Sequence, residues 1–137
     1  MNPRVSVVMS VYNGEPYLRQ AMESILLQTF TNFEFICVDD ASTDRSWQIL
    51  VNYAQQDSRV VLLRNRNNLG LTISLNRAFS LVKGEYIARQ DADDVSMSQR
   101  LDKQVAFLEH HPSVGLLGTA YEYISSDGQF LQAIEEP

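Results

Sequence analysis

Three aspartates stand within four residues of one another: Asp91, Asp93 and Asp94. Carboxylates this close repel one another at neutral pH unless solvent or a cation separates them. Magnesium and manganese typically take one or two protein carboxylates and fill their remaining coordination positions with water and phosphate oxygens. A solvated turn that caps the next helix would use the same residue types. The spacing therefore predicts either a divalent metal site or an ordinary turn.

A second acidic stretch, residues 39–44, follows an apolar segment. Its Asp40 could accept a hydrogen bond from an N–H of a nucleobase. The alternative is helix capping, because several neighbours carry side-chain oxygens that can accept from the first N–H groups of a helix. The capping candidates are Ser42, Thr43 and Asp44.

The first apolar run ends in a third polar cluster, where Ser10 offers a hydroxyl and Tyr12 a flat aromatic face for a base. A simple turn would explain these residues equally well. No Walker-type glycine-lysine sequence and no Gly-x-Gly-x-x-Gly follows this run, which disfavours dinucleotide cofactors. The charge of a diphosphate would then be met by a metal and by side chains, with three arginines as candidates: Arg64, Arg66 and Arg77.

The composition argues against several kinds of partner and site. The formal net charge of -6 argues against binding to a nucleic-acid backbone, which rewards Lys and Arg. The only cysteine, Cys37, lies in an apolar run, so an internal disulfide is impossible and a zinc cluster has no thiolates; we expect a core residue. His110 and His111 stand at a predicted helix end, and we interpret them as structural.

The elements that position these clusters alternate between strand and helix. Short β-branched runs predict strands, and apolar residues at helical spacing predict helices between them, so the fold class is α/β with a mainly parallel sheet flanked by helices. The predicted strands are 5–11, 33–38, 60–63 and 85–89, and the helices are 16–28, 47–54, 71–82 and 101–108. Ser42 and Thr43 are capping candidates for the second helix. Each polar cluster thus follows a strand, at the edge where open α/β sheets bind ligands.

The C-terminal stretch has a different pattern. Residues 114–117 and 119–124 are predicted strands, and a turn at 126–128 leads into 129–131 as a hairpin. At 137 residues the chain suits one domain, and no apolar run reaches the roughly 18 residues of a membrane-spanning helix, so we expect a cytoplasmic protein. Because no element closes the chain after 135–137, we expect a fragment of a longer protein.

The motifs, taken in order, resemble the opening part of the family 2 glycosyltransferases. The likeness covers nearly the whole chain and rests on the segments 5–13, 24–30, 38–44, 68–70 and 83–87, on Asn76, and on Asp91-Ala92-Asp93-Asp94 as the Asp-x-Asp motif. The resemblance implies a GT-A (Rossmann-like) fold and an enzyme, a hexosyl-type glycosyltransferase that transfers sugar from a nucleoside diphosphate donor with inversion.

The resemblance also implies the site. The donor-binding residues would be Ser10, Val11, Tyr12, Glu15, Asp40, Asn68, Gly70, Asn76, Asp91 and Ala92, and the ligands of Mn²⁺ or Mg²⁺ would be Asp93 and Asp91. The partners would be a nucleoside diphosphate sugar and a saccharide or lipid-linked acceptor in cell-envelope polysaccharide biosynthesis, at the inner face of the membrane through regions outside this chain. The general base would lie downstream of Pro137, so we expect this chain to bind donor and to transfer sugar poorly or not at all.

Two alternatives remain at this point. A nucleotidyltransferase also places acids at such a sheet edge, but it usually carries a glycine-rich loop after the first strand, where this chain has only Gly14. A nucleotide-binding module without activity would keep the same fold. Donor sugar, base, acceptor and oligomeric state are open.

Overall fold

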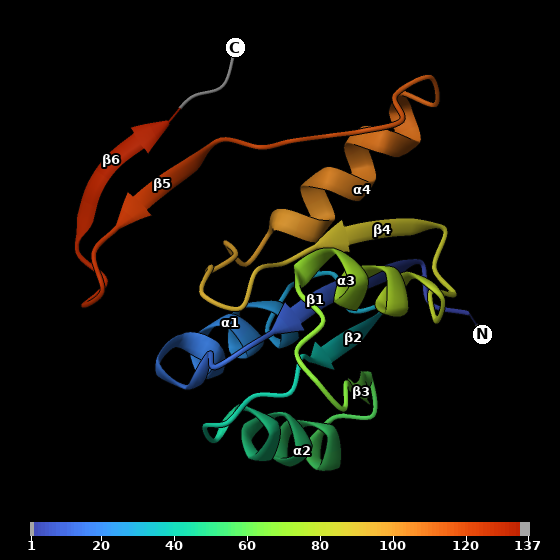
Figure 1. Cartoon of the computed structure of the whole chain (residues 1–137). Coiled ribbons are helices and arrows are strands. Elements are labelled where there is room, and N and C mark those ends of the chain that lie inside the picture. The colour runs from blue at the N-terminus through green and yellow to red at the C-terminus, as the bar shows by residue number, and fades with distance from the viewer. Residues whose placement is uncertain (1, 135–137) are drawn as a thin grey trace. The chain divides into compact units, whose positions relative to one another are not determined.

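Strands and helices alternate along the first three quarters of the chain, as predicted (Figure 1). The computed structural model describes residues 2–134, and the chain divides into two compact units, Met1–Lys103 and Gln104–Pro137. The expectation of a single domain over residues 1–137 stays a prediction. The first unit contains β1 (Val5–Val11), α1 (Glu15–Leu26), β2 (Phe33–Asp39), α2 (Ser46–Gln56), β3 (Val60–Arg64), α3 (Leu71–Phe79) and β4 (Tyr86–Arg89).

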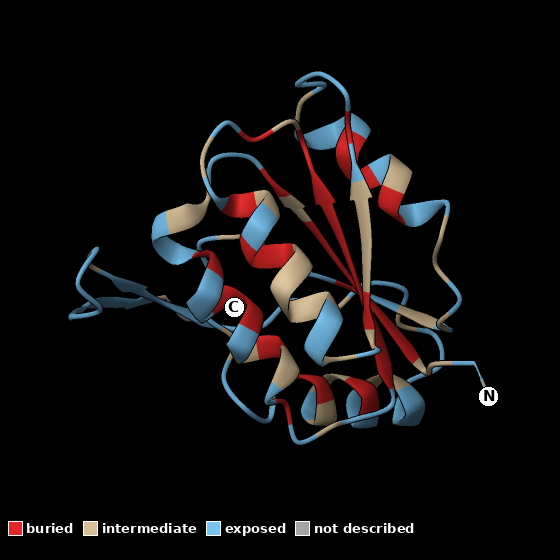
Figure 2. Cartoon of the chain, turned by 90° about the horizontal axis from the view of Figure 1, so that it is seen from below, coloured by how far each residue is buried: buried red, intermediate tan, exposed pale blue. Residues whose placement is uncertain are grey.

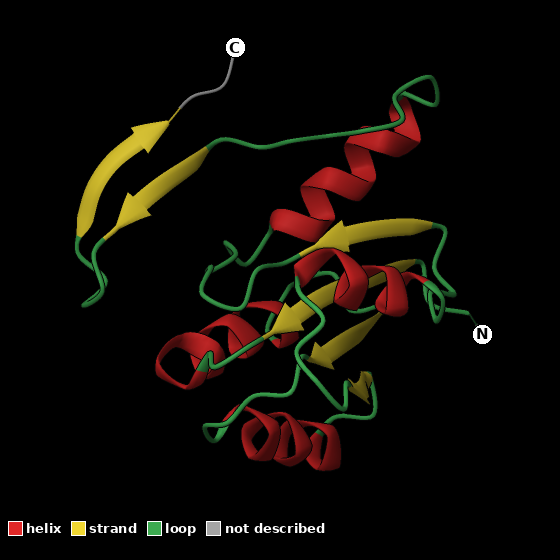
Figure 3. Ribbon diagram, in the orientation of Figure 1, coloured by secondary structure: helices red, strands yellow, loops and turns green. Residues whose placement is uncertain are grey.

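The four strands form one parallel sheet in the order β3-β2-β1-β4 (Figure 3). The chain steps outward from β1 to β2 and β3, and then crosses to the other side of β1 to form β4. This reversal creates a topological switch point beside β1, where α/β sheets bind ligands outside the carboxyl ends of their strands. Because Val11 pairs with Asp39 and Asp39 with Arg64, the loops after β1, β2 and β3 begin side by side.

The core lies on both faces of the two central strands (Figure 2). Val8 and Ile36 face α3, where they pack with its buried Leu75. On the opposite face the Cys37 sulfur lies 3.8 Å from the sulfur of Met22 in α1. Cys37 is fully buried, and this burial raises the pKa of its thiol, so its prediction as a core residue is confirmed.

A buried polar cluster fixes the opposite, amino-terminal edge of the sheet. Glu34 Oε1 accepts hydrogen bonds from Ser6 Oγ (2.6 Å) and from the backbone N–H of Lys83 (2.8 Å). The N–H of Gly84 donates to Ser6 Oγ at 2.9 Å. A Cβ on Gly84 would lie 2.6 Å from the backbone nitrogen of Ser6, so only glycine allows this approach. The turn before β4 is thereby held against β1, which sets the position of the loop at the far end of β4.

In the second unit, β5 (Tyr121–Ile124) and β6 (Phe130–Ile134) form the predicted antiparallel hairpin, with Gly128 at φ 85° in its turn. The helix α4 (Arg100–His110) begins in the first unit. A predicted strand at 114–117 is wrong, since the segment is irregular and begins with a turn in which Val114 N–H donates to His111 O (2.9 Å). A short apolar run becomes a strand only when a neighbouring strand pairs with its backbone.

All four helices lie where they were predicted, but their boundaries differ from the predicted ones by up to three residues. α3 ends at Phe79 rather than near Val82, because Leu81 and Val82 donate to carbonyls three residues back in tighter turns. α2 begins at Ser46, one residue before the predicted start, and ends at Gln56, two residues after the predicted end. Among residues 2–134, no helix combines the length and apolar character needed to cross a membrane.

Candidate functional site

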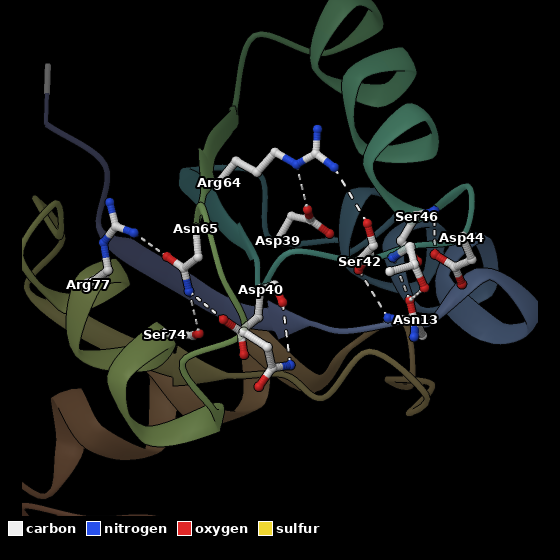
Figure 4. Close-up of polar contacts among 12 residues, drawn as sticks. Asn13, Asp39, Asp40, Ser42, Asp44, Ser46, Arg64, Asn65, Ser74 and Arg77 are labelled. Atoms are coloured by element: carbon white, nitrogen blue, oxygen red, sulfur yellow. Dashed lines mark hydrogen bonds and ion pairs between the residues drawn. The ribbon is translucent and has the colours of Figure 1, made fainter.

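The loops after β1 and β2 cap each other's helices (Figure 4). Backbone N–H groups at the start of α1 donate to side chains of the loop after β2 and of the first residue of α2: Asn13 to Ser42 Oγ (3.0 Å), Gly14 to Ser46 Oγ (2.9 Å) and Glu15 to Asp44 Oδ2 (3.0 Å). The two loops therefore form one rigid rim at the carboxyl edge of the sheet.

This exchange corrects the predicted caps. Ser42 and Thr43 were expected to cap the second helix, but the Ser42 hydroxyl serves Asn13, and the N–H of Thr43 donates to Asn13 Oδ1 at 2.8 Å. Asp44, the third candidate, does accept from Ser46 N–H at 2.9 Å. Glu15, predicted as a donor-binding residue, accepts from the Arg45 backbone N–H at 3.0 Å, so its carboxylate serves the start of α2.

Asp40 is 2% exposed, and both of its carboxylate oxygens are occupied by the chain itself. Oδ1 accepts from Asn65 Nδ2 (2.6 Å) and Leu69 N–H (2.8 Å), and Oδ2 accepts from Gly70 N–H (2.8 Å). Burial raises the pKa of Asp40, but these hydrogen bonds lower it by more, so the pKa lies below its usual value. Asp40 thus connects the end of β2 to the loop before α3. Its contact with a base stays a prediction.

Its neighbour Asp39 presents the opposite case. Asp39 is fully buried, and its Oδ2 accepts from Arg64 Nε at 3.0 Å. The guanidinium of Arg64 also lies 5.0 Å from the ring centre of Trp47. Asp39 Oδ1 is the one buried side-chain oxygen or nitrogen in residues 2–134 that has no hydrogen-bond partner. An unpaired buried acceptor is costly, which makes this oxygen a candidate contact for a ligand N–H.

An open pocket of about 440 Å³ is lined by Ala41, Arg64, Asn65 and Arg66, and the lining residue Arg64 is the one that donates to Asp39. Of the three arginines predicted to assist a diphosphate, Arg64 is held by Asp39 and Arg77 donates to Asn65 Oδ1. Arg66 is exposed beside the pocket. Arg64 and Arg66 are thus both exposed at this pocket, and Arg77 is half-buried.

The end of β1 presents Tyr12, whose side chain is 53% exposed beyond the last strand residue. Ser10 is half-buried. The side chain of Val11 is fully buried and belongs to the core. The backbone carbonyl of Val11 accepts a hydrogen bond from Asp40 N–H at 2.7 Å, so the backbone belongs to the rim. The following Asn13 has φ 49°, which turns the chain sharply into α1 and leaves the Tyr12 ring exposed.

The acidic loop follows β4, on the other side of the switch point. Asp91 makes an exposed ion pair with Arg89, with Nη2 and Oδ1 2.9 Å apart, and Asp93 and Asp94 are exposed. Partial desolvation and then repulsion from Asp91 and Asp93 raise the pKa of Asp94. The loop lies against the start of α1, because a Cβ on Gly14, the residue before α1, would be 3.7 Å from Ala92 Cβ.

The residues of this loop suit a hard divalent cation. Within residues 2–134 no three His, Cys, Asp or Glu side chains gather into a ready-made metal cluster. Magnesium and manganese need only one or two carboxylates, provided that water and phosphate complete the shell. An ion pair as exposed as Arg89–Asp91 contributes about 0–1 kcal/mol, so a cation can compete for Asp91. The oxygen donors of Asp91 and Asp93 therefore fit such an ion.

The remaining predicted residues lie on or after the loop that precedes α3. Asn68 Nδ2 is 3.5 Å from the carbonyl of Asp40, and Gly70 adopts φ 86° where its N–H reaches Asp40. Asn76 is exposed on α3. Sequence reasoning missed Asp39 and Gln90 as candidate site residues. Asp39 ends the buried strand β2 and Gln90 directly follows β4, and polar residues at strand ends are a usable signal.

The chain was compared with protein-family models and with known proteins. The family model described as "Glycosyl transferase family 2" matches residues 6–136. EpsE of Bacillus subtilis (strain 168), provisionally named a glycosyltransferase, is 44% identical over 98% of this chain and 50% of its own length. This chain spans about half the length of the curated relatives it matches.

Two solved structures share the fold. TarS 1-349 of S. aureus in complex with UDP-GlcNAc has a TM-score of 0.75 and 26% identity over 88% of this chain and 40% of that one. The mannosyltransferase PcManGT from Pyrobaculum calidifontis, in complex with GDP-Man and Mn²⁺, has a TM-score of 0.72 and 26% identity over 79% of this chain and 33% of that one. The predicted GT-A fold is confirmed. The chain belongs to glycosyl transferase family 2.

Proposed function

We propose that this chain is the donor-binding part of a glycosyltransferase that holds a nucleoside diphosphate sugar through Mn²⁺ or Mg²⁺ for inverting transfer to an acceptor hydroxyl. The observation that carries the proposal is the meeting of two loops at the switch point. Exposed Tyr12 follows β1, the acidic residues Asp91 and Asp93 follow β4, and Gly14 lies against Ala92 between them. The complexes of TarS with UDP-GlcNAc and of PcManGT with GDP-Man and Mn²⁺ support it.

The nucleoside end of the donor is assigned to the β1–β2 side. Asp39 Oδ1 is a buried acceptor that lacks a partner, and a base N–H would satisfy it. Tyr12 offers an exposed ring against which a base can pack. In this assignment Asp40 acts on the ligand indirectly, since its carboxylate shapes the loop that carries Asn68 and Gly70.

The diphosphate end is assigned to the acidic loop, where Asp91 and Asp93 would hold the metal. A bound divalent cation would offset the negative charge that develops on the departing nucleoside diphosphate. None of Asp91, Asp93 and Asp94 is assigned as the general base, because that base must reach the acceptor hydroxyl rather than the metal. We propose that the base and the acceptor site belong to the part of the protein that the matched relatives have and this chain does not span.

Calorimetry with UDP and GDP, each in Mn²⁺ and in EDTA, tests the proposal. We expect at least one nucleotide to bind, with higher affinity in Mn²⁺. Absence of binding by both nucleotides in both conditions would contradict the donor site. Equal affinity in Mn²⁺ and EDTA would contradict the metal role alone.

A further inference from the structure

We infer that Gln90 is a positioning residue for the metal-binding loop, an inference that rests on the proposed function. Gln90 is the first residue after β4, and its side chain is 3% exposed. Its backbone N–H donates to Val8 O at 3.0 Å, which continues the pairing of β4 with β1. The position of Gln90 is therefore fixed by the central strand of the sheet.

Both the nitrogen and the oxygen of the Gln90 side-chain amide form hydrogen bonds. Nε2 donates to the backbone carbonyls of Asp91 (3.2 Å) and Asp94 (2.8 Å). Oε1 accepts from Ser96 Oγ (2.7 Å) and Arg100 Nη1 (2.9 Å). A primary amide has two N–H donors and one carbonyl acceptor, so the group is fully engaged.

The chemistry of these partners fixes which end of the amide faces which group. Arginine only donates hydrogen bonds, so the atom that faces Arg100 must be Oε1, and the backbone carbonyls only accept, so Nε2 must face Asp91 and Asp94. Arg100 is in turn held by Ser96 Oγ (2.9 Å) and by the carbonyl of Arg89 (2.8 Å). The amide is thereby locked in one orientation.

The loop wraps around this locked amide. The carbonyls on either side of Asp93 point inward to Gln90, and Asp94 N–H donates to Asp91 O at 3.2 Å. The exposed side chain of Asp93 therefore stands on a backbone that is held at both ends. Without the amide, the mutual repulsion of three neighbouring carboxylates would open the turn. Gln90 holds the acids together before any cation arrives.

A second buried glutamine provides a matched control. Gln28 is also 3% exposed, and its amide bonds the carbonyls of Ser24 (2.9 Å) and Met97 (2.7 Å) and the N–H of Leu101 (3.0 Å). It supports the segment that enters α4 and has no bond to the acidic turn itself. The same substitution at both sites, Gln90→Met and Gln28→Met, removes a buried amide of equal exposure while keeping a similar side-chain length.

The test measures Mn²⁺ affinity by electron paramagnetic resonance in the presence of saturating UDP, and UDP affinity in EDTA by calorimetry. GDP replaces UDP in both measurements if the unmodified chain binds GDP and not UDP. Gln90→Met is expected to weaken Mn²⁺ binding by about 10- to 100-fold, the usual cost of losing a group that orients metal ligands, and to leave UDP affinity in EDTA unchanged. Gln28→Met is expected to leave both affinities unchanged. Unchanged Mn²⁺ affinity in Gln90→Met, or equal losses in the two variants, would overturn the inference.

Two further results distinguish a failure of this inference from a failure of the proposed metal site or of the variant's folding. If the unmodified chain binds no Mn²⁺ with either UDP or GDP, the proposed metal role fails and the inference falls with it. If Gln90→Met fails to fold by circular dichroism, Arg100→Lys replaces it, because lysine keeps the charge but cannot reach Gln90, Ser96 and Arg89 together. Weaker Mn²⁺ binding in Arg100→Lys supports the inference, and unchanged binding overturns it.

Discussion

The carboxylate of Asp40 accepts a hydrogen bond from the backbone N–H of Gly70 at 2.8 Å, across 30 residues of sequence. This bond joins the end of β2 to the start of α3 at the same edge of the sheet. Gly70 has φ 86°, a conformation in which glycine is favoured. Asp40 therefore determines the shape of the loop that borders the candidate nucleotide site.

Replacing Asp40 by alanine is expected to lower the free energy of unfolding by about 2–4 kcal/mol, since Leu69 N–H, Gly70 N–H and the Asn65 amide lose a charged acceptor. Denaturant unfolding followed by circular dichroism measures this loss. A variant with unchanged stability and no nucleotide binding would instead indicate that Asp40 contacts the base directly.

Acid is expected to destabilise the protein through the same residue. The pKa of Asp40 is lowered in the folded state, so its contribution to stability is present above the unfolded-state pKa and is lost as pH falls through the folded-state value. The free energy of unfolding should decline from about pH 4 downward. Asp40→Asn should show a shallower decline over that range in urea titrations at successive pH values; an identical decline would contradict the role of Asp40.

Gly84→Ala is expected to destabilise the protein by about 1–3 kcal/mol, because its Cβ would meet the backbone of Ser6 and Val5 at 2.6 and 2.7 Å. Gly115→Ala is the matched control, since its Cβ would meet nothing within 4 Å. Thermal unfolding of both variants gives the comparison. Equal midpoints would mean that the turn before β4 is not tightly held against β1.

Much of this architecture could be predicted from local pattern. The β1 boundaries, Val5–Val11, agree with those read from one β-branched run, and the acidic residues were correctly placed after strands. Buried parallel strands have distinctive composition, and the edge on which their loops gather follows from connectivity. The sheet, its ligand-binding edge and the candidate acids were therefore accessible without coordinates.

The roles of individual polar residues were not accessible in the same way. Ser42 serves Asn13 across 29 residues, and Gln28 binds Leu101 across 73. Such partners come together only after the sheet has formed, so a local rule assigns Ser42 to the nearest helix. For the same reason the sequence could not show that both carboxylate oxygens of Asp40 are hydrogen-bonded, whereas Asp39 has an unpaired oxygen.

Asp39→Asn separates those two aspartates experimentally. Because Arg64 only donates, the new amide should turn its oxygen to Arg64 and place its NH₂ group where Oδ1 now stands. A base N–H would then face a donor, and UDP affinity in EDTA should fall by about 1–3 kcal/mol. Calorimetry measures the change, and an affinity equal to that of the unmodified chain would remove Asp39 from the proposed site.

The metal role of the acidic loop is the central claim, and Asp93→Ala tests it most directly. Asp93 is exposed, so its removal should leave the fold intact, and Lys103→Ala is a control at another exposed position. Calorimetric titration of UDP and GDP in Mn²⁺ and in EDTA compares both variants with the unmodified chain. We predict that Asp93→Ala abolishes the gain in affinity that Mn²⁺ produces and that Lys103→Ala retains it. The same gain in both variants would contradict the account.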